Sequence, residues 1–305
     1  MDGISASPAA IGAARRGAER ALAKVASKKN APHRAPFLDL HAANKTAVYL
    51  ELYPHMDAVW TGEASNYELG PDHFLVGVAG VPFGLPSQML SGAVRKQPRL
   101  YYRALLFGMT ERAGWFDSDT SLARLGALWA VVDAFELRDS ELVGFWRRGD
   151  ARFAATAPGD CGDRVKRTAF VVDGAAVVVL ASWASTPCAV DVDVAALGPR
   201  AAAFQPRVPH LQCGAPAEDV ASGTLRVDVD AGAGAVVVAH GPARAAAAAP
   251  LVPPPGPCPA PSGRPRPRGP GPGARRARSP ETEAKTRLGK SVGMRRPGRG
   301  GAGGL

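Results

Sequence analysis

Four apolar segments between residues 36 and 116 decide how the first half of this chain folds. They run Pro-Phe-Leu-Asp-Leu-His at 36–41, Leu-Tyr-Pro-His-Met-Asp-Ala-Val-Trp-Thr-Gly-Glu at 52–63, Gly-Val-Pro-Phe-Gly-Leu-Pro at 80–86, and Leu-Phe-Gly-Met-Thr-Glu-Arg-Ala-Gly-Trp at 106–115. Each segment is a short apolar run that ends in polar or aromatic residues. This pattern is typical of buried parallel strands whose carboxyl ends open onto a functional site.

Carboxylates and aromatic rings gather at the ends of these segments. Carboxylates handle protons and stabilise oxocarbenium charge, and flat rings pack against the C–H faces of sugars, so the combination predicts carbohydrate chemistry. The candidate site residues are Asp39, His41, Trp60, Glu63, Tyr67, Glu68 and Trp115.

Glu63 is the first candidate for a catalytic carboxylate, because it follows a strand end directly after Trp60 and Gly62. Its alternative role is that of a loop carboxylate or helix cap. Asp39 and His41 are two residues apart, so on one strand they share a face and would both point toward the site. The alternative for His41 is a buried histidine that bonds to the backbone.

The aromatic candidates Trp60, Tyr67 and Trp115 would form a stacking platform, although each of them also suits a core position. Trp129 and Trp183 fall within a predicted helix and a predicted strand, and both are expected in the core.

Charge is concentrated at the two ends of the chain. Residues 1–35 carry +5 and residues 243–305 carry +11, whereas residues 36–242 carry −6, which together make the net +10. The acidic middle favours a neutral or cationic substrate over nucleic acid. The basic tail has no aromatic residue for base stacking, so no specific nucleic-acid binding is predicted.

The remaining composition argues against metal and membrane functions. The four cysteines are at least 25 residues apart, which excludes zinc-ribbon and CxxC motifs and favours isolated thiols, with a Cys161–Cys188 or Cys188–Cys213 bridge as the alternatives. The histidines at 41, 55 and 73 match no metal-ligand spacing. No cofactor or metal is predicted, and the sequence shows neither a secretory signal nor an apolar run approaching the ~20 residues of a membrane span.

The first half of the chain alternates predicted helices with predicted strands. Residues 10–29 form a basic amphipathic helix, which is either a barrel helix or a transit peptide. Strands are expected at 36–40, 58–60 and 102–109, and helices at 44–55, from Pro71 to about Gly77, and at 120–135. Residues 80–92, with Pro82, Gly84 and Pro86, are expected to be a loop.

The pattern changes after about residue 151. Thr168 to Trp183, with Asp173-Gly174 at the centre, predicts a β-hairpin with a primed turn. Alternating residues at 190–194 and 225–229 and an apolar run at 235–239 predict further strands of a small antiparallel sandwich. Beyond 243 the Ala, Pro, Gly and Arg composition predicts a disordered tail.

Several short motifs along the chain, taken in their order, resemble those of glycoside hydrolase family 123. They are Leu38-Asp39-Leu40-His41, Trp60-x-Gly62-Glu63, Gly80-Val81-Pro82-Phe83-Gly84-Leu85, Phe107-Gly108-Met109-Thr110, Glu141-Leu142-Val143-Gly144-Phe145-Trp146 and Ala181-Ser182-Trp183-Ala184. The resemblance covers roughly residues 10–240. It implies a (β/α)8 barrel followed by a β-sandwich. It also implies hydrolysis of a glycosidic bond next to an N-acetylated amino sugar, whose acetamido group acts as nucleophile beside an adjacent Asp-Glu pair.

The chain departs from that family pattern in two ways. No Asp is followed directly by Glu, and only three or four βα units are visible where a full barrel needs eight. The expected organisation is therefore the C-terminal portion of a barrel at 1–150, an antiparallel sandwich at 151–242 and a tail at 243–305. The expected function is that of a truncated glycosidase, and the alternative is a non-catalytic carbohydrate-binding pseudoenzyme. Compartment and oligomeric state are not predicted.

Overall fold

A computed structural model of the 305-residue chain describes residues 7–29, 35–43, 46–61, 66, 68–89, 98–111, 119–147, 161–197, 202–209, 211–220 and 223–253. The chain divides into a unit at Met1–Cys258, which holds all of these residues, and a second unit at Pro259–Leu305. Residues 243–253, which were predicted to belong to the disordered tail, instead form short helical segments with Ala248 buried, and the rest of the predicted tail lies outside the described residues. No helix in the described part is both long and apolar enough to cross a membrane.

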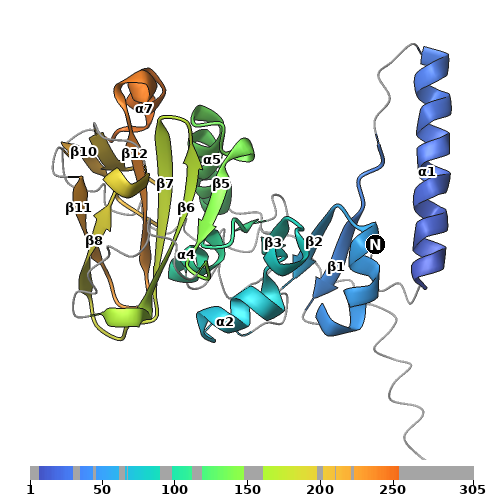
Figure 1. The fold of residues 1–305 in the computed structure, drawn as a ribbon, viewed down its shortest axis with the longest axis horizontal. Helices are drawn as coiled ribbons and strands as arrows, with labels where there is room; N and C mark the ends of the chain where they lie inside the picture. The colour runs from blue at the N-terminus through green and yellow to red at the C-terminus, as the bar shows by residue number, and fades with distance from the viewer. Residues whose placement is uncertain are drawn as a thin grey trace, which may run out of the picture. The chain divides into compact units, whose positions relative to one another are not determined.

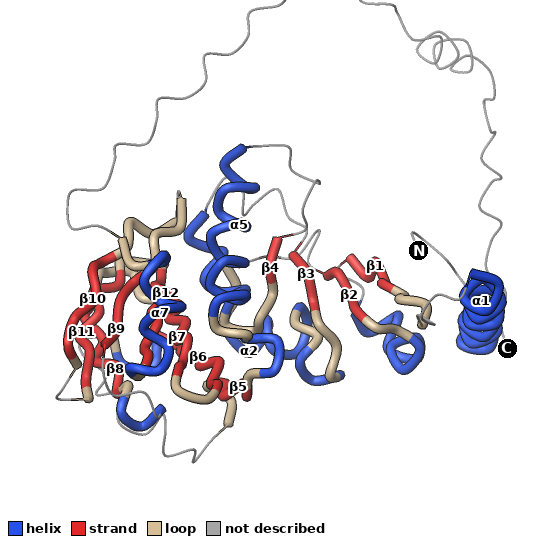
Figure 2. Tube along the Cα trace, turned by 90° about the horizontal axis from the view of Figure 1, so that it is seen from above, coloured by secondary structure: helices blue, strands red, loops and turns tan. Residues whose placement is uncertain are grey.

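The first sheet is parallel, with its four strands side by side in chain order (Figures 1 and 2). The strands are β1 at Asp39–Ala43, β2 at Ala58–Thr61, β3 at Ser87–Met89 and β4 at Thr110–Glu111. Parallel neighbours need a crossover, and a helical segment supplies each one. The crossovers are 3₁₀ helix η1 at Thr46–His55, α2 at Pro71–His73 with η2 at Phe74–Val78 and η3 at Val81–Phe83, and η4 at Pro98–Leu100 with α4 at Tyr101–Leu105. This is the repeat of a (β/α) barrel, and the described strands form an open sheet rather than a closed barrel.

Two expectations for this region are wrong. Residues 80–92 were expected to be a loop, but they contain β3, which pairs with both β2 and β4. Residues 102–109 were expected to be a strand, but α4 occupies Tyr101–Leu105 and Gly108 turns the chain at a φ of +70°. Residues 101 to 107 are all buried, and a short run buried on every side has no periodicity that separates a helix from a strand.

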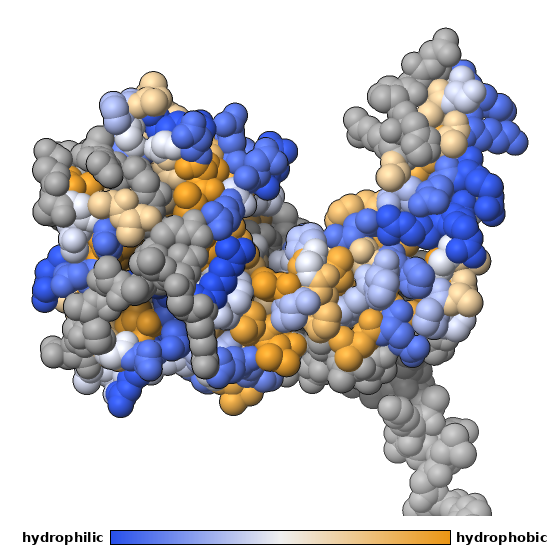
Figure 3. Space-filling view, viewed as in Figure 1, coloured by the Kyte–Doolittle hydropathy of each residue, from blue (hydrophilic) through white to orange (hydrophobic). Residues whose placement is uncertain are grey.

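The N-terminal helix α1 (Pro8–Lys29) forms as expected and docks on the parallel sheet through its first half. Ile11 is buried in a cluster with Leu40, Ala42 and Val59, which lie on the helix-facing side of β1 and β2. Further along the same helix face Leu22 and Val25 are 38% and 49% exposed. Figure 3 shows a run of hydrophilic side chains along α1.

The second sheet has six strands, all paired antiparallel, in the order β10-β9-β12-β7-β6-β5. Its strands are β5 at Glu141–Gly144, β6 at Val165–Val172, β7 at Ala175–Ser182, β9 at Ala202–Gln205, β10 at Ala215–Asp219 and β12 at Gly234–His240. A further pair, β8 at Cys188–Asp193 and β11 at Thr224–Val229, forms a two-stranded antiparallel sheet. The hairpin and the strands at β8, β11 and β12 were expected, whereas β5, β9 and β10 were not.

The six-stranded sheet is covered on both faces. One face of β7, at Val177 and Val179, packs with α4 and α5 (Asp119–Ala134). The other face, at Val178 and Leu180, packs against β8 and β11. Figures 1 and 2 both place α5 beside this sheet. The two layers of strands are consistent with the predicted sandwich, but the second sheet has only two described strands, so the sandwich stays a prediction.

Short helical segments complete the described chain. They are η5 at Leu137–Asp139, η6 at Gly162–Arg164, η7 at Ala195–Leu197, η8 at Pro242–Arg244, α7 at Ala245–Ala248 and η9 at Ala249–Leu251.

Helix α4 approaches the six-stranded sheet closely because β12 begins with a glycine. A Cβ atom at Gly234 would collide with the Leu180 carbonyl oxygen and with the ring of Tyr102. The Tyr102 hydroxyl donates a hydrogen bond to the Leu211 carbonyl oxygen at 2.9 Å. The parallel region and the antiparallel region therefore share one core through α4.

The turn of the β6–β7 hairpin is not of the primed kind. Val172 pairs with Ala175, which leaves Asp173 and Gly174 as the two-residue turn. Gly174 has a φ of +71°, and Asp173 is not among the residues with positive φ. Positive φ at the second turn residue alone is the pattern of a type II turn, whereas primed turns need it at the first.

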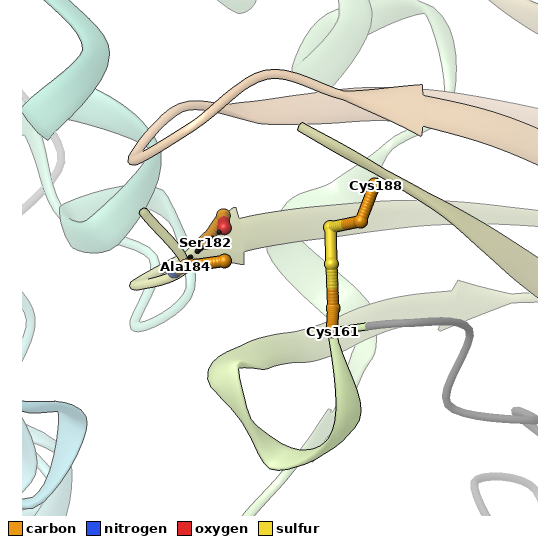
Figure 4. Close-up of a disulfide and its surroundings, with 4 residues drawn as sticks. All are labelled: Cys161, Ser182, Ala184 and Cys188. Carbon is orange, nitrogen blue, oxygen red and sulfur yellow. Dashed lines mark hydrogen bonds between the residues drawn. A yellow bond between two sulfur atoms is a disulfide. The ribbon is translucent and has the colours of Figure 1, made fainter. Parts of the chain in front are cut away.

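The cysteines are not isolated thiols. A disulfide joins Cys161, before β6, to Cys188 at the start of β8, with the two Cα atoms 5.9 Å apart (Figure 4). Beside it Ser182 accepts a hydrogen bond on its hydroxyl oxygen from the Ala184 N–H at 3.0 Å. Cys213 is also disulfide-bonded. The Cys161–Cys188 bridge, one of the two alternatives named from the sequence, is confirmed. Cysteine spacing alone could not select it, because the fold brings together residues 27 positions apart.

Candidate functional site

One row of residues crosses all four parallel strands. His41 of β1 is the register partner of Trp60 of β2, Trp60 is the partner of Gln88 of β3, and Gln88 is the partner of Thr110 of β4. Register partners on neighbouring strands point to the same face of a sheet. Because Leu40 and Val59 point to the helix-covered face, the side chains of His41, Trp60 and Gln88 lie on the opposite face, which in a barrel is the interior.

His41 and Trp60 stack at the centre of this row. Their ring centroids are 3.7 Å apart and the ring planes meet at 15°. Trp60 is 7% exposed, whereas His41 is partly exposed. The indole therefore lies against one side of the imidazole, and His41 is the less buried residue of the pair. Asp39 is two residues before His41 on the same face of β1 and is also partly exposed.

Glu68 lies in a different setting, on the turn before α2. Its carboxylate forms an ion pair with the buried Arg103 of α4 at 3.1 Å, and the Arg103 guanidinium lies 4.8 Å from the centre of the Trp183 ring. Burial lowers the pKa of Arg103, and the charge and hydrogen bond of Glu68 oppose that shift. Trp183 donates from Nε1 to the Leu69 carbonyl oxygen at 2.9 Å. In this arrangement Glu68 joins the turn to the core and neutralises a buried charge.

A second carboxylate in an ion pair, that of Asp57, lies directly before the first residue of β2. Asp57 accepts two hydrogen bonds from Arg15 of α1, at 2.9 and 3.1 Å, and a third from the Leu38 N–H at 2.8 Å. Burial opposes the ionisation of Asp57, but these bonds outweigh it and lower the pKa of the carboxyl. This carboxylate holds α1 to the start of the strands and is not part of the row.

Three of the predicted site residues, Glu63, Tyr67 and Trp115, lie outside the described residues. Of the other four, the structure brings Asp39, His41 and Trp60 together on one face and places Glu68 in the ion pair with Arg103.

The sequence analysis missed two members of the row, Gln88 and Thr110. Gln88 could have been recognised as a polar residue in the middle of the short strand Ser87–Met89, but residues 80–92 were predicted to be a loop.

Together with Asp39, the row brings an imidazole, an amide and a carboxylate beside the flat ring of Trp60. Amide and carboxylate groups hydrogen-bond hydroxyls, and the rings offer apolar surface to C–H groups. The described residues contain no group of three His, Cys, Asp or Glu side chains that could hold a metal ion.

Two family models match the chain along most of its length. The glycoside hydrolase 123 TIM-barrel domain matches residues 19–114, and the glycoside hydrolase 123 C-terminal domain matches residues 125–239. The fold and these matches define a glycoside hydrolase-like protein. The chain belongs to glycoside hydrolase family 123, as the motifs in its sequence indicated.

Similarity to solved structures is more distant. A GH30 endoxylanase from Clostridium papyrosolvens shares 11% sequence identity at a TM-score of 0.34, over 62% of this chain and 50% of the endoxylanase. A GH27 β-L-arabinopyranosidase from Geobacillus stearothermophilus shares 10% identity at a TM-score of 0.27, over 73% of this chain and 61% of that protein. The chain spans about half to three fifths of the length of these proteins, and neither informs the site. No curated protein matched the chain.

Proposed function

We propose that this protein binds a carbohydrate on the inner face of its parallel sheet and hydrolyses a glycosidic bond there. The observation that carries the proposal is the row of His41, Trp60 and Gln88, in register on the face of the sheet opposite the cluster that packs under α1. A sugar ring would lie against the accessible side of His41, which Trp60 supports from behind. Asp39 and Gln88 would bind hydroxyl groups.

The proposed substrate is a glycoside of an N-acetylated amino sugar. This part of the proposal rests on membership of the family, since the row itself does not distinguish among sugars. The acetamido oxygen of the substrate would attack the anomeric carbon while a protonated carboxylic acid of the protein gives its proton to the leaving oxygen. Water would then attack the anomeric carbon, release the acetamido group and return a proton to the carboxylate. Glu63 is the proposed proton donor because it follows Thr61, the last residue of β2, by two positions in the sequence. Tyr67 and Trp115 are proposed as further substrate contacts.

The test measures release of 4-nitrophenol from 4-nitrophenyl N-acetyl-β-galactosaminide and the corresponding glucosaminide by the full chain. Glu63→Gln removes the proton donor with little change in size, and it is expected to lower kcat at least a hundredfold. Glu51→Gln is the matched control, because Glu51 is an exposed carboxylate on η1. Unchanged turnover in Glu63→Gln would remove that residue from the proposal.

The second candidate function is carbohydrate binding without hydrolysis. The absence of any Asp-Glu dipeptide favours it, because that pair orients the acetamido group in the pattern that the family implies. Titration with N-acetylgalactosamine, followed by NMR, separates the two candidates. Saturable binding that His41→Ala weakens, together with no turnover of either nitrophenyl glycoside, supports the binding function. If neither binding nor turnover is detected, both candidates fail.

A further inference from the structure

A cavity of about 430 Å³ lies between helix α5 and the six-stranded sheet. Leu128 and Val131 line it from α5, and Val177 and Val179 line it from β7. The cavity is open to solvent on one side, and its inner walls are aliphatic side chains that offer water no hydrogen-bond partners. The volume lies within the range of small-molecule binding sites, roughly 300–1,000 Å³. The cavity therefore suits an apolar ligand.

Two lining residues differ from the rest of the walls. Trp129 of α5, which the helical periodicity placed in the core, is 47% exposed, and Arg138 of η5 is also exposed. Within the described part of the chain, neither side chain has a hydrogen bond, an ion pair or a ring partner. The cavity thus combines an apolar interior with one uncompensated positive charge and a half-exposed indole.

We propose that this cavity binds an amphipathic monocarboxylate, such as a medium-chain fatty acid. The acyl chain lies among the aliphatic side chains of α5 and β7, and the carboxylate pairs with the Arg138 guanidinium, which binds carboxylates through two parallel hydrogen bonds. Trp129 covers the part of the chain nearest the solvent. A sugar is a poor ligand here, because its hydroxyl groups would be buried without partners.

The cavity is separate from the proposed carbohydrate site. Pro86 and Gly108 also line it, and these residues precede β3 and β4. It therefore borders the amino ends of the parallel strands, whereas Glu63 follows the carboxyl end of β2. The fatty-acid proposal does not depend on the proposed glycosidase function.

Calorimetric titration of the full chain with decanoate, below its micelle concentration, tests the proposal. Saturable one-to-one binding is expected. Arg138→Gln is expected to weaken decanoate binding about tenfold, the effect of losing one partly solvated charge-assisted contact, and to leave decanol binding unchanged. Arg207→Gln is the matched control, because Arg207 is an exposed arginine of the same region that does not line the cavity.

A second variant tests the cavity itself. Val132 lines the cavity and is partly buried, so Val132→Phe should narrow it and abolish the binding of both decanoate and decanol. Circular dichroism establishes that the variant is folded; if it is not, the surface pair Arg138→Gln and Arg207→Gln decides alone. The proposal is overturned if decanoate shows no saturable binding, if the two arginine variants bind alike, or if folded Val132→Phe binds as the wild type does.

Discussion

The parallel sheet and the six-stranded antiparallel sheet are buried in different ways, as β1 and β2 of the first and β7 and β12 of the second show. On one face β1 and β2 rest on a single cluster of seven buried residues, and the other face carries the polar row with His41. β7 is buried at all eight of its positions, because α4 and α5 cover one face and β8 and β11 cover the other. One strand pair thus carries polar side chains on one face, whereas β7 is covered by packed apolar layers on both faces.

The strands of the antiparallel region are also paired over more residues than those of the parallel region. β7 pairs with β6 over eight residues and with β12 over seven, whereas β1 and β2 pair over four with a shift in register after His41. Local unfolding costs less free energy in regions with few buried contacts and short strand pairings than it does in the core. The comparison therefore predicts that the antiparallel region supplies most of the stability and that the candidate site lies on its less stable neighbour.

The largest expected effect comes from matched leucine truncations in the two regions. Leu180→Ala in β7 should lower the free energy of unfolding by about 4 kcal/mol, because Leu180 is fully buried between two packed layers. Leu40→Ala in β1 should cost about 2 kcal/mol, because its small cluster can relax around the cavity. Urea denaturation measures both values, and equal losses would contradict the comparison.

The next effect comes from the disulfide in the antiparallel region. Replacing both Cys161 and Cys188 by Ala should cost about 3.5 kcal/mol, the loop-closure entropy for a bridge across 27 residues. Hydrogen exchange should show faster opening of β6 and β8 with little change in β1 and β2. Slower or unchanged exchange in β6 and β8 would show that packing alone holds these strands.

A smaller effect is expected where the two regions are joined by the Glu68–Arg103 ion pair. Glu68→Gln leaves the charge of Arg103 buried without its counter-charge, and it should cost about 1 kcal/mol because Glu68 is half exposed. Glu19→Gln is the control, since Glu19 makes an exposed pair with Arg15 on α1. Thermal unfolding of both variants measures the difference, and equal melting temperatures would mean that solvent already screens Arg103.

The smallest effect concerns the Asp57–Arg15 contact, which holds α1 to β1 and β2. The folded state lowers the pKa of Asp57, so its contribution to stability is present above the unfolded pKa of about 3.9 and is lost as the pH falls through the lower folded value. Asp57→Asn should therefore lower the melting temperature at pH 7 by less than Glu68→Gln does. The difference from wild type should shrink below about pH 4, and a difference that stays constant down to pH 2 would contradict this account.

The long elements of the second half were predictable from the sequence. Helix α5 shows a helical period over 16 residues, whereas β7 and β12 were recognised as apolar runs of eight and seven residues, with the Asp173-Gly174 turn marking the hairpin before β7. The site was only partly predictable. The spacing of Asp39 and His41 placed them on one face, but β3 is three residues long, and a ladder of that length leaves no period in which Gln88 could be recognised.

The sequence by itself determined the succession of parallel and antiparallel strands, the family, and the carboxylates and rings near the strand ends, because local periodicity and short motifs carry that information. The tertiary structure decided which apolar residues are buried. Leu125 of α5 is buried whereas Trp129 is half exposed, although both lie on the predicted apolar face. It also paired Cys161 with Cys188, Glu68 with Arg103, and His41 with Trp60. These contacts join residues distant in sequence, so they exist only once the strands have found their register and the helices have packed.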